Sequence, residues 1–318
     1  MKFYLAPLEG LTGYIYRNTY AKYFGEVDKY FTPFIAANQH GKWSGREKQD
    51  VSPVNNSGKK VIPQVLTNNI KDFKRTAEQL AALGYDEMNL NLGCPSGTVV
   101  SKGKGSGFLG YPEALETFLE AIFEQPIVKI SIKTRLGVEE PEEFEKILQI
   151  FNQYPMEELI IHPRVRKAFY KDTPNLEVFA EALKNSRMPV CYNGDLFTAQ
   201  DYERIHAQFP EVDRMMFGRG ILANPSLIVQ IKKGEVLDKA RMKAFHDELY
   251  EAYQEVLSGD RNILFKMKEM WFYMANAFEA PEKYIKQVKK SQKCTDYEHA
   301  VAVLFENCQV ISTGFSKK

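Results

Sequence analysis

No uncharged apolar stretch of this sequence approaches the roughly 18–20 residues that a membrane-spanning helix requires. Cysteine is scarce, and the four residues Cys94, Cys191, Cys294 and Cys308 form neither a CxxC pair nor a zinc-ligand spacing. A disulfide scaffold and a structural metal are therefore not expected. Neither sign of charge is in excess, since 42 Lys and Arg stand against 41 Asp and Glu, for a formal net charge of +1. We expect a cytoplasmic, reduced protein without a signal peptide.

The composition is that of a globular protein, and the chain shows a regular alternation of elements. It has 318 residues, of which 44% are hydrophobic and 26% charged, enough for about two domains or for one large α/β barrel with an appendage. Short apolar runs alternate with amphipathic helical stretches through about residue 235. The runs that we interpret as strands are 3–7, 29–35, 61–66, 87–93, 127–133, 158–162, 190–193 and 214–217.

This alternation predicts an α/β fold, a (β/α)8 TIM barrel over residues 1–237. Several strands are too apolar for a sheet with one wet face, which favours a parallel sheet covered on both sides. Helices are expected between the strands, for example over 70–83 and over 198–208, where Thr198 and Asp201 resemble a capping box. A six-stranded doubly wound sheet is the alternative, and it would leave two of the runs unplaced.

The pattern changes after the barrel, and residues 238–318 predict a small C-terminal helical domain. The segment contains no convincing strand, and helical stretches such as 238–257 and 263–278 follow one another. Five lysines occur within eleven residues that hold no acid: Lys283, Lys286, Lys289, Lys290 and Lys293. Such a run is most often a solvated helix face, and the functional alternative is a strip that contacts phosphates.

Polar residues follow the predicted strands. In a TIM barrel the carboxyl ends of all strands open into one mouth, where the active site lies. Each polar residue at a strand end, considered alone, is most simply interpreted as a packing residue or as solvated surface. Because all of the strand ends meet at the mouth, these residues together predict one site. The stretch 97–110 after Cys94, which includes Lys102, is expected to be a mobile active-site loop. Residues 105–110 match the GxGxxG motif, but they do not predict a dinucleotide site, because no strand leads directly into the motif.

Five segments together resemble the tRNA-dihydrouridine synthases. They are Asn91-Leu92-Gly93-Cys94-Pro95 with the Gly/Lys loop, Lys133-Thr134-Arg135, His162-Pro163-Arg164, Asn193-Gly194-Asp195 and Gly218-Arg219-Gly220. The match runs in order through the barrel, and the helical tail agrees with the C-terminal tRNA-binding domain of that family. Its members are FMN-dependent enzymes that reduce the 5,6 double bond of particular uridines in tRNA, usually with NADPH. The resemblance implies this activity, with FMN, NADPH and tRNA as cofactor, electron donor and partner, and we expect a monomer.

The resemblance also implies roles for individual residues. Cys94 would protonate C5 of uracil while reduced FMN delivers hydride to C6, and a thiol is mostly protonated at neutral pH. Asn91 would meet the uracil edge. The residues implied at the isoalloxazine are Ala6, Pro7, Leu8, Gln64, Lys133 and His162. Those implied at the flavin phosphate are Asn193, Gly194, Asp195, Gly218 and Arg219. Those implied at tRNA are Arg135, Arg164, Lys102, Lys286, Lys289 and Lys290.

Two other functions stay open at this stage. An FMN-dependent barrel oxidoreductase of a small pyrimidine would share the phosphate-binding strand ends but would not need the helical tail. A non-catalytic RNA-binding barrel would not need Cys94 beside a Gly-rich loop. The net charge of +1 weighs mildly against RNA, although a local basic groove would be sufficient to bind it.

Overall fold

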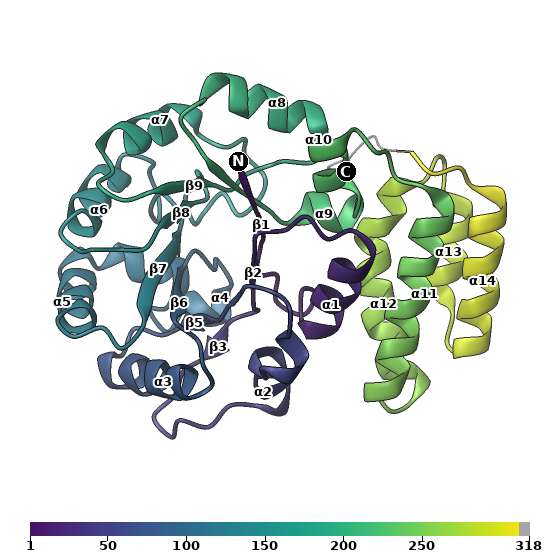
Figure 1. Cartoon of the computed structure of the whole chain (residues 1–318), viewed down its shortest axis with the longest axis horizontal. Coiled ribbons are helices and arrows are strands. Elements are labelled where there is room, and N and C mark those ends of the chain that lie inside the picture. The colour runs from purple at the N-terminus through teal and green to yellow at the C-terminus, as the bar shows by residue number, and fades with distance from the viewer. Residues whose placement is uncertain (312–318) are drawn as a thin grey trace. The chain divides into compact units, whose positions relative to one another are not determined.

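The predicted barrel is confirmed by a computed structural model, which describes residues 1–311 (Figure 1). Every paired strand runs parallel to its neighbours in a single sheet, in the order β3-β5-β6-β7-β8-β9-β10-β1-β2-β4. The strands are β1 (Lys2–Leu5), β2 (Lys29–Phe31), β3 (Ile35–Ala36), β4 (Val61–Ile62), β5 (Gln64–Leu66), β6 (Glu87–Leu92), β7 (Lys129–Thr134), β8 (Leu159–Ile161), β9 (Val190–Tyr192) and β10 (Arg214–Phe217).

Two prolines explain why ten strands stand where eight were predicted. Pro33 separates β2 from β3, and Pro63 separates β4 from β5, because proline offers no N–H to the ladder. Since β2 pairs with β4 and β3 with β5, the two interrupted strands lie side by side and close the sheet into a barrel. The Thr32 Oγ1 fills the gap by accepting a hydrogen bond from Gln64 N at 3.0 Å.

The barrel interior is filled by one cluster of buried side chains, which we call the core layer. It consists of Tyr4, Ala6, Phe31, Ile62, Ile160, Cys191 and Met216. At the amino ends of the strands a buried ion cluster continues the packing: Lys29 Nζ lies 2.8 Å from both Glu87 and Glu158. Arg214 is 3.1 Å from Glu158 as well. Each buried charge in this cluster is paired, as burial requires.

The chain divides into two compact units. The first contains Met1–Pro7, Lys29–Gly194 and Phe209–Met216; the second contains Leu8–Asp28, Asp195–Gln208 and the residues from Phe217 onwards. The boundary that the sequence predicts between residues 237 and 238 stays a prediction, and the last seven residues of that predicted domain lie outside the described residues.

Short-range signals account for the ends of several helices. Asn69 accepts a hydrogen bond from Asp72 N and so caps α3, while Pro112 occupies the first turn of α5. The helices of the first unit are α2 (Gly45–Val51), η1 (Val54–Asn56), α3 (Ile70–Ala82), α4 (Gly97–Val100), η2 (Gly105–Gly110), α5 (Pro112–Phe123), α6 (Glu143–Phe151) and α7 (Leu176–Asn185).

The second unit is built from helices. The predicted capping box is confirmed, since Asp201 N donates to Thr198 Oγ1 and Thr198 N donates to the Asp201 carboxylate. Its helices are α1 (Tyr14–Tyr23), α8 (Ala199–Gln208), α9 (Arg219–Ala223), α10 (Leu227–Lys233), α11 (Lys239–Val256), α12 (Asp260–Met274), η3 (Ala275–Ala277), α13 (Glu282–Lys290) and α14 (Cys294–Asn307).

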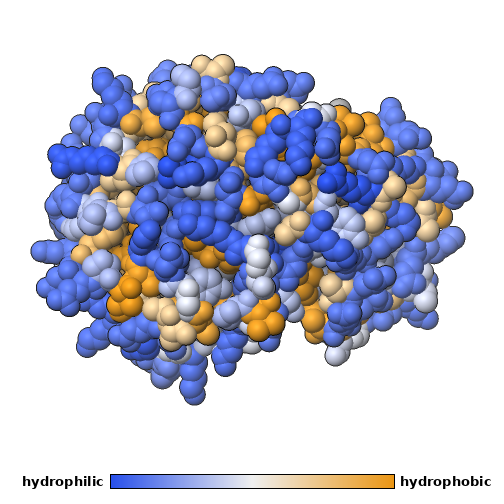
Figure 2. Space-filling view, viewed as in Figure 1, coloured by the Kyte–Doolittle hydropathy of each residue, from blue (hydrophilic) through white to orange (hydrophobic). Residues whose placement is uncertain are grey.

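A polar contact network lies in the core of the C-terminal helices. The hydroxyl of Tyr297 on α14 accepts a hydrogen bond from Trp271 Nε1 at 2.8 Å and lies 2.6 Å from His246 Nε2. All three side chains are buried, so the network joins α11, α12 and α14. Among residues 1–311 no helix has the length and apolar character to cross a membrane. Mostly hydrophilic side chains cover the face drawn in Figure 2, with hydrophobic residues in small groups between them.

Candidate active site

Strand register places the predicted polar residues of the first unit on the interior face of the barrel. Gln64, His162 and Asn193 each lie two positions beyond a member of the core layer, namely Ile62, Ile160 and Cys191. Because side chains alternate along a strand, these residues share the interior face and lie nearer the carboxyl ends.

The same register extends to the two strands between them. Lys133 on β7 is paired with Ile160 on β8 and with Asn91 on β6. Paired residues of parallel strands point to the same face. The structure therefore brings together Gln64, Asn91, Lys133, His162 and Asn193, as the sequence predicted.

Both the oxygen and the nitrogen of the Asn91 side-chain amide form hydrogen bonds with neighbouring residues. Its Oδ1 accepts hydrogen bonds from Gly93 N at 3.0 Å and from Cys94 N at 2.9 Å. Its Nδ2 donates to Gln64 Oε1 at 2.7 Å, and Gln64 Nε2 donates in turn to Asn89 Oδ1 at 2.8 Å. The turn that carries Cys94 is thus tied to the barrel interior through Asn91.

The carbonyl of Cys94 is held from the other side by the segment that follows. It accepts hydrogen bonds from Ser106 N at 3.1 Å and from Ser106 Oγ at 2.8 Å. Gly105 permits this approach: its φ is +58°, and a Cβ there would lie 2.7 Å from Cys94 O. Cys94 forms no disulfide, and the residue is partly exposed. Sequence reasoning missed Ser106 entirely, and the glycines around it were the only available signal.

The segment 97–110 differs in character from the mobile loop that was expected. It folds into the short helices α4 and η2, and Asn68 Nδ2 donates to Lys102 O at 3.0 Å and to Gly103 O at 3.1 Å. The residues that match GxGxxG form η2, where each glycine allows neighbouring atoms to pack closely against the backbone. Lys102 itself is exposed.

Lys133 is a cation without a partner among residues 1–311. Its Nζ forms no hydrogen bond or ion pair with the residues that the structure describes. Burial lowers the pKa of Lys133 to about 8, and the nearby Arg135 guanidinium contributes to the same decrease. Lys133 is half-buried, and an unpaired ammonium that has lost part of its hydration is costly unless a ligand compensates it, so Lys133 suits an electron-rich or anionic group in the barrel mouth.

Arg164 fixes the hydrogen-bonding state of His162. Arg164 Nη1 lies 2.9 Å from His162 Nε2; since a guanidinium only donates, Nε2 accepts and the neutral ring carries its hydrogen on Nδ1. Arg164 is in turn held by the carbonyl oxygen of Asp172, to which its Nε donates at 2.7 Å.

Arg135 and Arg164 differ from the expectation that they face tRNA phosphates. They are 1% and 2% exposed. Arg135 Nε donates to Gly93 O at 2.9 Å, and its Nη1 donates to Val165 O at 3.0 Å. The five-donor fork of arginine also matches backbone carbonyls, and here both side chains hold the loops after β6 and β8.

The residues predicted to bind a phosphate divide between the two units. In the first unit, Asn193 Nδ2 donates to Met216 O at 2.8 Å, and Gly194 follows it in the chain. In the second, Arg219 Nη2 donates to Asp195 Oδ1 at 2.7 Å. Gly218 is the N-cap of α9.

The opening segment is divided in the same way. Ala6 and Pro7 belong to the first unit and Leu8 to the second. Ala6 is 3% exposed in the core layer. Leu8 N donates to Thr12 Oγ1 at 2.8 Å, which begins a turn after the first strand.

Four lysines of the C-terminal strip are exposed on the amphipathic helix α13, and Lys293 is exposed at the N-cap of α14. Ile285 and Val288 form the buried side of α13, with 6% and 0% exposure. The exposed lysines of this region are Lys283, Lys286, Lys289, Lys290 and Lys293. This arrangement fits a solvated face and a phosphate-contacting strip equally.

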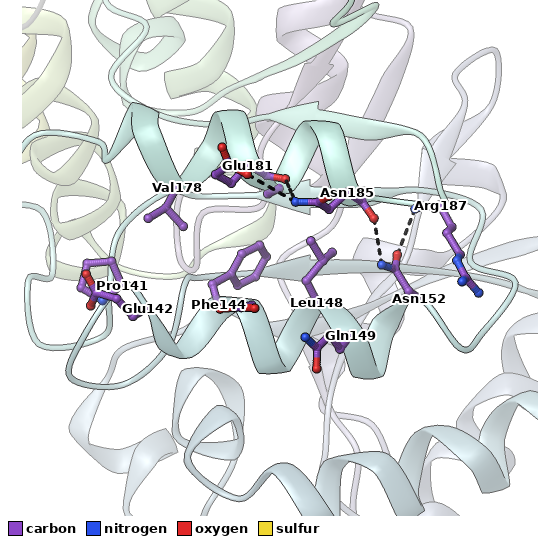
Figure 3. Close-up of a pocket in the computed structure, with 12 residues that line it drawn as sticks. Pro141, Glu142, Phe144, Leu148, Gln149, Asn152, Val178, Glu181, Asn185 and Arg187 are labelled. Carbon is purple, nitrogen blue, oxygen red and sulfur yellow. Dashed lines mark hydrogen bonds between the residues drawn. The ribbon is translucent and has the colours of Figure 1, made fainter.

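A hollow outside the barrel mouth lies between α6 and α7 (Figure 3). It measures about 620 Å³, and Phe144 and Leu148 of α6 point towards α7 in it. Asn152 Nδ2 closes one side by donating to Asn185 O at 2.9 Å. Because two outer helices line this hollow and no strand end reaches it, the mouth of the barrel remains the candidate active site.

Comparison with known proteins shows which family the chain matches. The family described as "Dihydrouridine synthase (Dus)" matches residues 4–310. The chain is 28% identical over 267 residues to a "Probable tRNA-dihydrouridine synthase" of Staphylococcus aureus (strain COL), covering 80% of this chain and 78% of that protein. It is 27% identical over 270 residues to the "Probable tRNA-dihydrouridine synthase 2" of Bacillus subtilis (strain 168), covering 80% and 79%.

Solved structures share the fold at low sequence identity. Morphinone reductase in complex with tetrahydroNAD superposes with a TM-score of 0.52 at 13% identity, covering 74% of this chain and 88% of that one. The old yellow enzyme homologue of Zymomonas mobilis gives a TM-score of 0.53 at 13% identity, covering 75% and 90%. These similarities concern the barrel architecture alone.

Proposed function

Because the chain belongs to the dihydrouridine synthase family, we propose that it is a flavin-dependent enzyme that reduces the 5,6 double bond of uridines in tRNA. The observation that most supports this chemistry is that the backbone of Cys94 is held by hydrogen bonds on both sides. Asn91 holds its amide and Ser106 holds its carbonyl, so the backbone of a partly exposed cysteine is held in place after the end of β6. A donor held in a defined position is what proton transfer to a substrate carbon needs.

The cofactor of this proposal is FMN. Bound there, it would supply the hydride for uracil C6. Lys133 supports the assignment, because its unpaired ammonium in the barrel mouth suits the electron-rich edge of an isoalloxazine ring. Ala6, Pro7, Leu8, Gln64 and His162 are proposed to hold the ring. The residues proposed at the single terminal phosphate are Asn193, Gly194, Asp195, Gly218 and Arg219.

The side chains of the site have separate tasks in this proposal. Cys94 delivers the proton to uracil C5. His162, held by Arg164, offers its Nδ1–H as a hydrogen-bond donor. Arg135 holds the Gly93 carbonyl and thereby supports the turn from which Cys94 extends. Arg135 and Arg164 thus act as positioning residues for the site.

The partners of this reaction are NADPH as electron donor and tRNA as substrate, with a monomeric, cytoplasmic enzyme. Lys102, Lys286, Lys289 and Lys290 are exposed and are proposed to contact the RNA backbone, because exposed lysines are the usual source of salt-dependent RNA affinity.

The experiment combines purified protein, FMN and NADPH with tRNA from a strain that lacks the gene. We expect mass spectrometry of the digested tRNA to find dihydrouridine, and the denatured protein to release FMN. Product from free uracil but none from tRNA would favour the small-pyrimidine enzyme. Colourless protein that FMN cannot reconstitute would contradict both.

A further inference from the structure

A second hollow opens beside the segment that follows Cys94. It measures about 940 Å³ and lies between the start of α3, the tip of the segment 97–110 and the first turns of α5, all within the first unit. Its size is in the range of small-molecule sites. The lining residues on which the inference rests are Asn68, Lys71, Gly103, Phe108, Tyr111 and Phe118.

Aromatic side chains form the floor and one wall of this hollow. Phe108 and Phe118 are 4% and 2% exposed, and their rings meet edge-to-face at 5.4 Å. Tyr111 lines the same hollow with 60% exposure, so its ring is accessible to a ligand. A wide-open aromatic ring beside an apolar floor suits a flat, sequence-tolerant partner such as a nucleobase.

The charge of the hollow is complementary to a phosphate. Lys71 is exposed and forms no ion pair with residues 1–311, and no carboxylate is among the residues that line the hollow. The acids nearest in sequence are already engaged: Asp72 pairs with Arg75 at 3.3 Å, and Glu113 pairs with Lys146 at 2.9 Å. A cation next to a stacking ring is the combination found in single-stranded nucleic-acid sites.

The hollow is connected to the catalytic segment by direct contacts. Asn68 binds the carbonyls of Lys102 and Gly103, and a Cβ added at Gly103 would lie 3.3 Å from Asn68 Nδ2 and 4.0 Å from the Tyr111 ring. The same segment reaches Cys94 through Ser106. A ligand in the hollow would therefore contact the segment that holds the Cys94 carbonyl.

We propose that this hollow binds one nucleotide of the RNA substrate outside the catalytic pocket, with its base on Tyr111 and its phosphate near Lys71. The inference rests on the proposed function for the identity of the RNA. Flipping the target uridine out of its stack costs a few kcal/mol, and stacking of a second base on Tyr111 offsets part of that cost.

The test measures tRNA binding by the FMN-loaded full chain carrying Tyr111→Ala, Tyr111→Phe or Lys71→Ala. Ile127→Ala, an exposed apolar residue elsewhere on the first unit, and Lys184→Ala on α7 are the matched controls. We expect Tyr111→Ala to weaken binding about tenfold and Tyr111→Phe by less than about twofold, since stacking needs the ring alone. Lys71→Ala should lower the slope of log affinity against log salt by about 0.7–0.9.

A second measurement does not depend on any variant. Ultraviolet cross-linking of the wild-type protein to tRNA, followed by peptide mass spectrometry, should find a nucleotide adduct on the peptide that contains Tyr111. Binding by Tyr111→Ala equal to that of Ile127→Ala, or adducts only elsewhere, would overturn the proposal. These outcomes are separate from the failure of the proposed function, which would appear as wild-type protein that forms no dihydrouridine.

Discussion

The side-chain oxygen of Asn91 accepts a hydrogen bond from the backbone amide of Cys94 at 2.9 Å. The same oxygen also accepts from Gly93 N, and the amide nitrogen donates to Gln64. One buried side chain thus joins the turn that carries the thiol to the neighbouring strand. Asn91 was predicted to meet the substrate edge; that role stays a prediction, and these contacts add a positioning role that can be tested separately.

Replacing Asn91 by Ala should lower both stability and activity. The change leaves the partly buried Gly93 and Cys94 amides and the buried side-chain oxygen of Gln64 without their partner, and a buried unsatisfied group costs about 1–3 kcal/mol. We expect the free energy of unfolding, measured with urea, to fall by at least about 1 kcal/mol. Asn91→Asp keeps the acceptor for both amides but loses the donor to Gln64, so its activity, relative to its stability, should be closer to the wild type than that of Asn91→Ala. Wild-type activity in Asn91→Ala would contradict the positioning role.

Replacing Arg164 by Met should release His162 from its single tautomer. In the wild-type protein, ¹⁵N NMR of the imidazole should show a hydrogen on Nδ1 and an accepting Nε2, because Arg164 donates to Nε2. In Arg164→Met both tautomers should be populated, and flavin affinity should fall. An unchanged spectrum would show that Arg164 does not control the ring.

Flavin binding should depend on pH through Lys133. The pKa of Lys133 is lowered to about 8, and an electron-rich ring favours the charged amine. Affinity should therefore be greatest near neutral pH and should decrease as the pH rises through about 8. Fluorescence titration with FMN measures this decrease; Lys133→Arg should preserve affinity at high pH, since its guanidinium stays charged. A wild-type affinity that is constant across this range would refute the assignment.

The lysine strip can be tested by charge reversal. Replacing Lys286, Lys289 and Lys290 with Glu should weaken tRNA binding and lower its salt slope by about 0.7–0.9 for each phosphate that the strip no longer neutralises. Flavin content should be unchanged, because the predicted flavin residues lie elsewhere in the chain. Unchanged tRNA affinity across a salt series would identify the strip as a solvated face.

The sequence predicted the barrel because its strands are short, strongly apolar runs between amphipathic helices. The predicted runs 29–35 and 61–66 each contain a proline, Pro33 and Pro63, whose missing N–H interrupts the strand. That signal was in the sequence and was missed. The capping box at Thr198 was predictable because its partners are three residues apart.

Hydrogen bonds between remote parts of the chain were less accessible. The motif containing Arg135 indicated a functional position. The partners of the Arg135 side chain are the backbone carbonyls of Gly93 and Val165. Because every residue has a backbone carbonyl, the sequence does not show which carbonyl an arginine binds. Ser106 was missed for the same reason. The lysines of α13 could be placed on an exposed face from their spacing, yet exposure alone does not identify a ligand.

The most direct test of the central claim separates the two half-reactions in Cys94→Ala. Cys94 is proposed to act on the uracil and not on the cofactor, so this variant should bind FMN and oxidise NADPH like the wild-type protein. With tRNA from the deletion strain, it should form almost no dihydrouridine by mass spectrometry. Loss of NADPH oxidation and of tRNA reduction to the same extent, or dihydrouridine formation at the wild-type rate, would contradict the account.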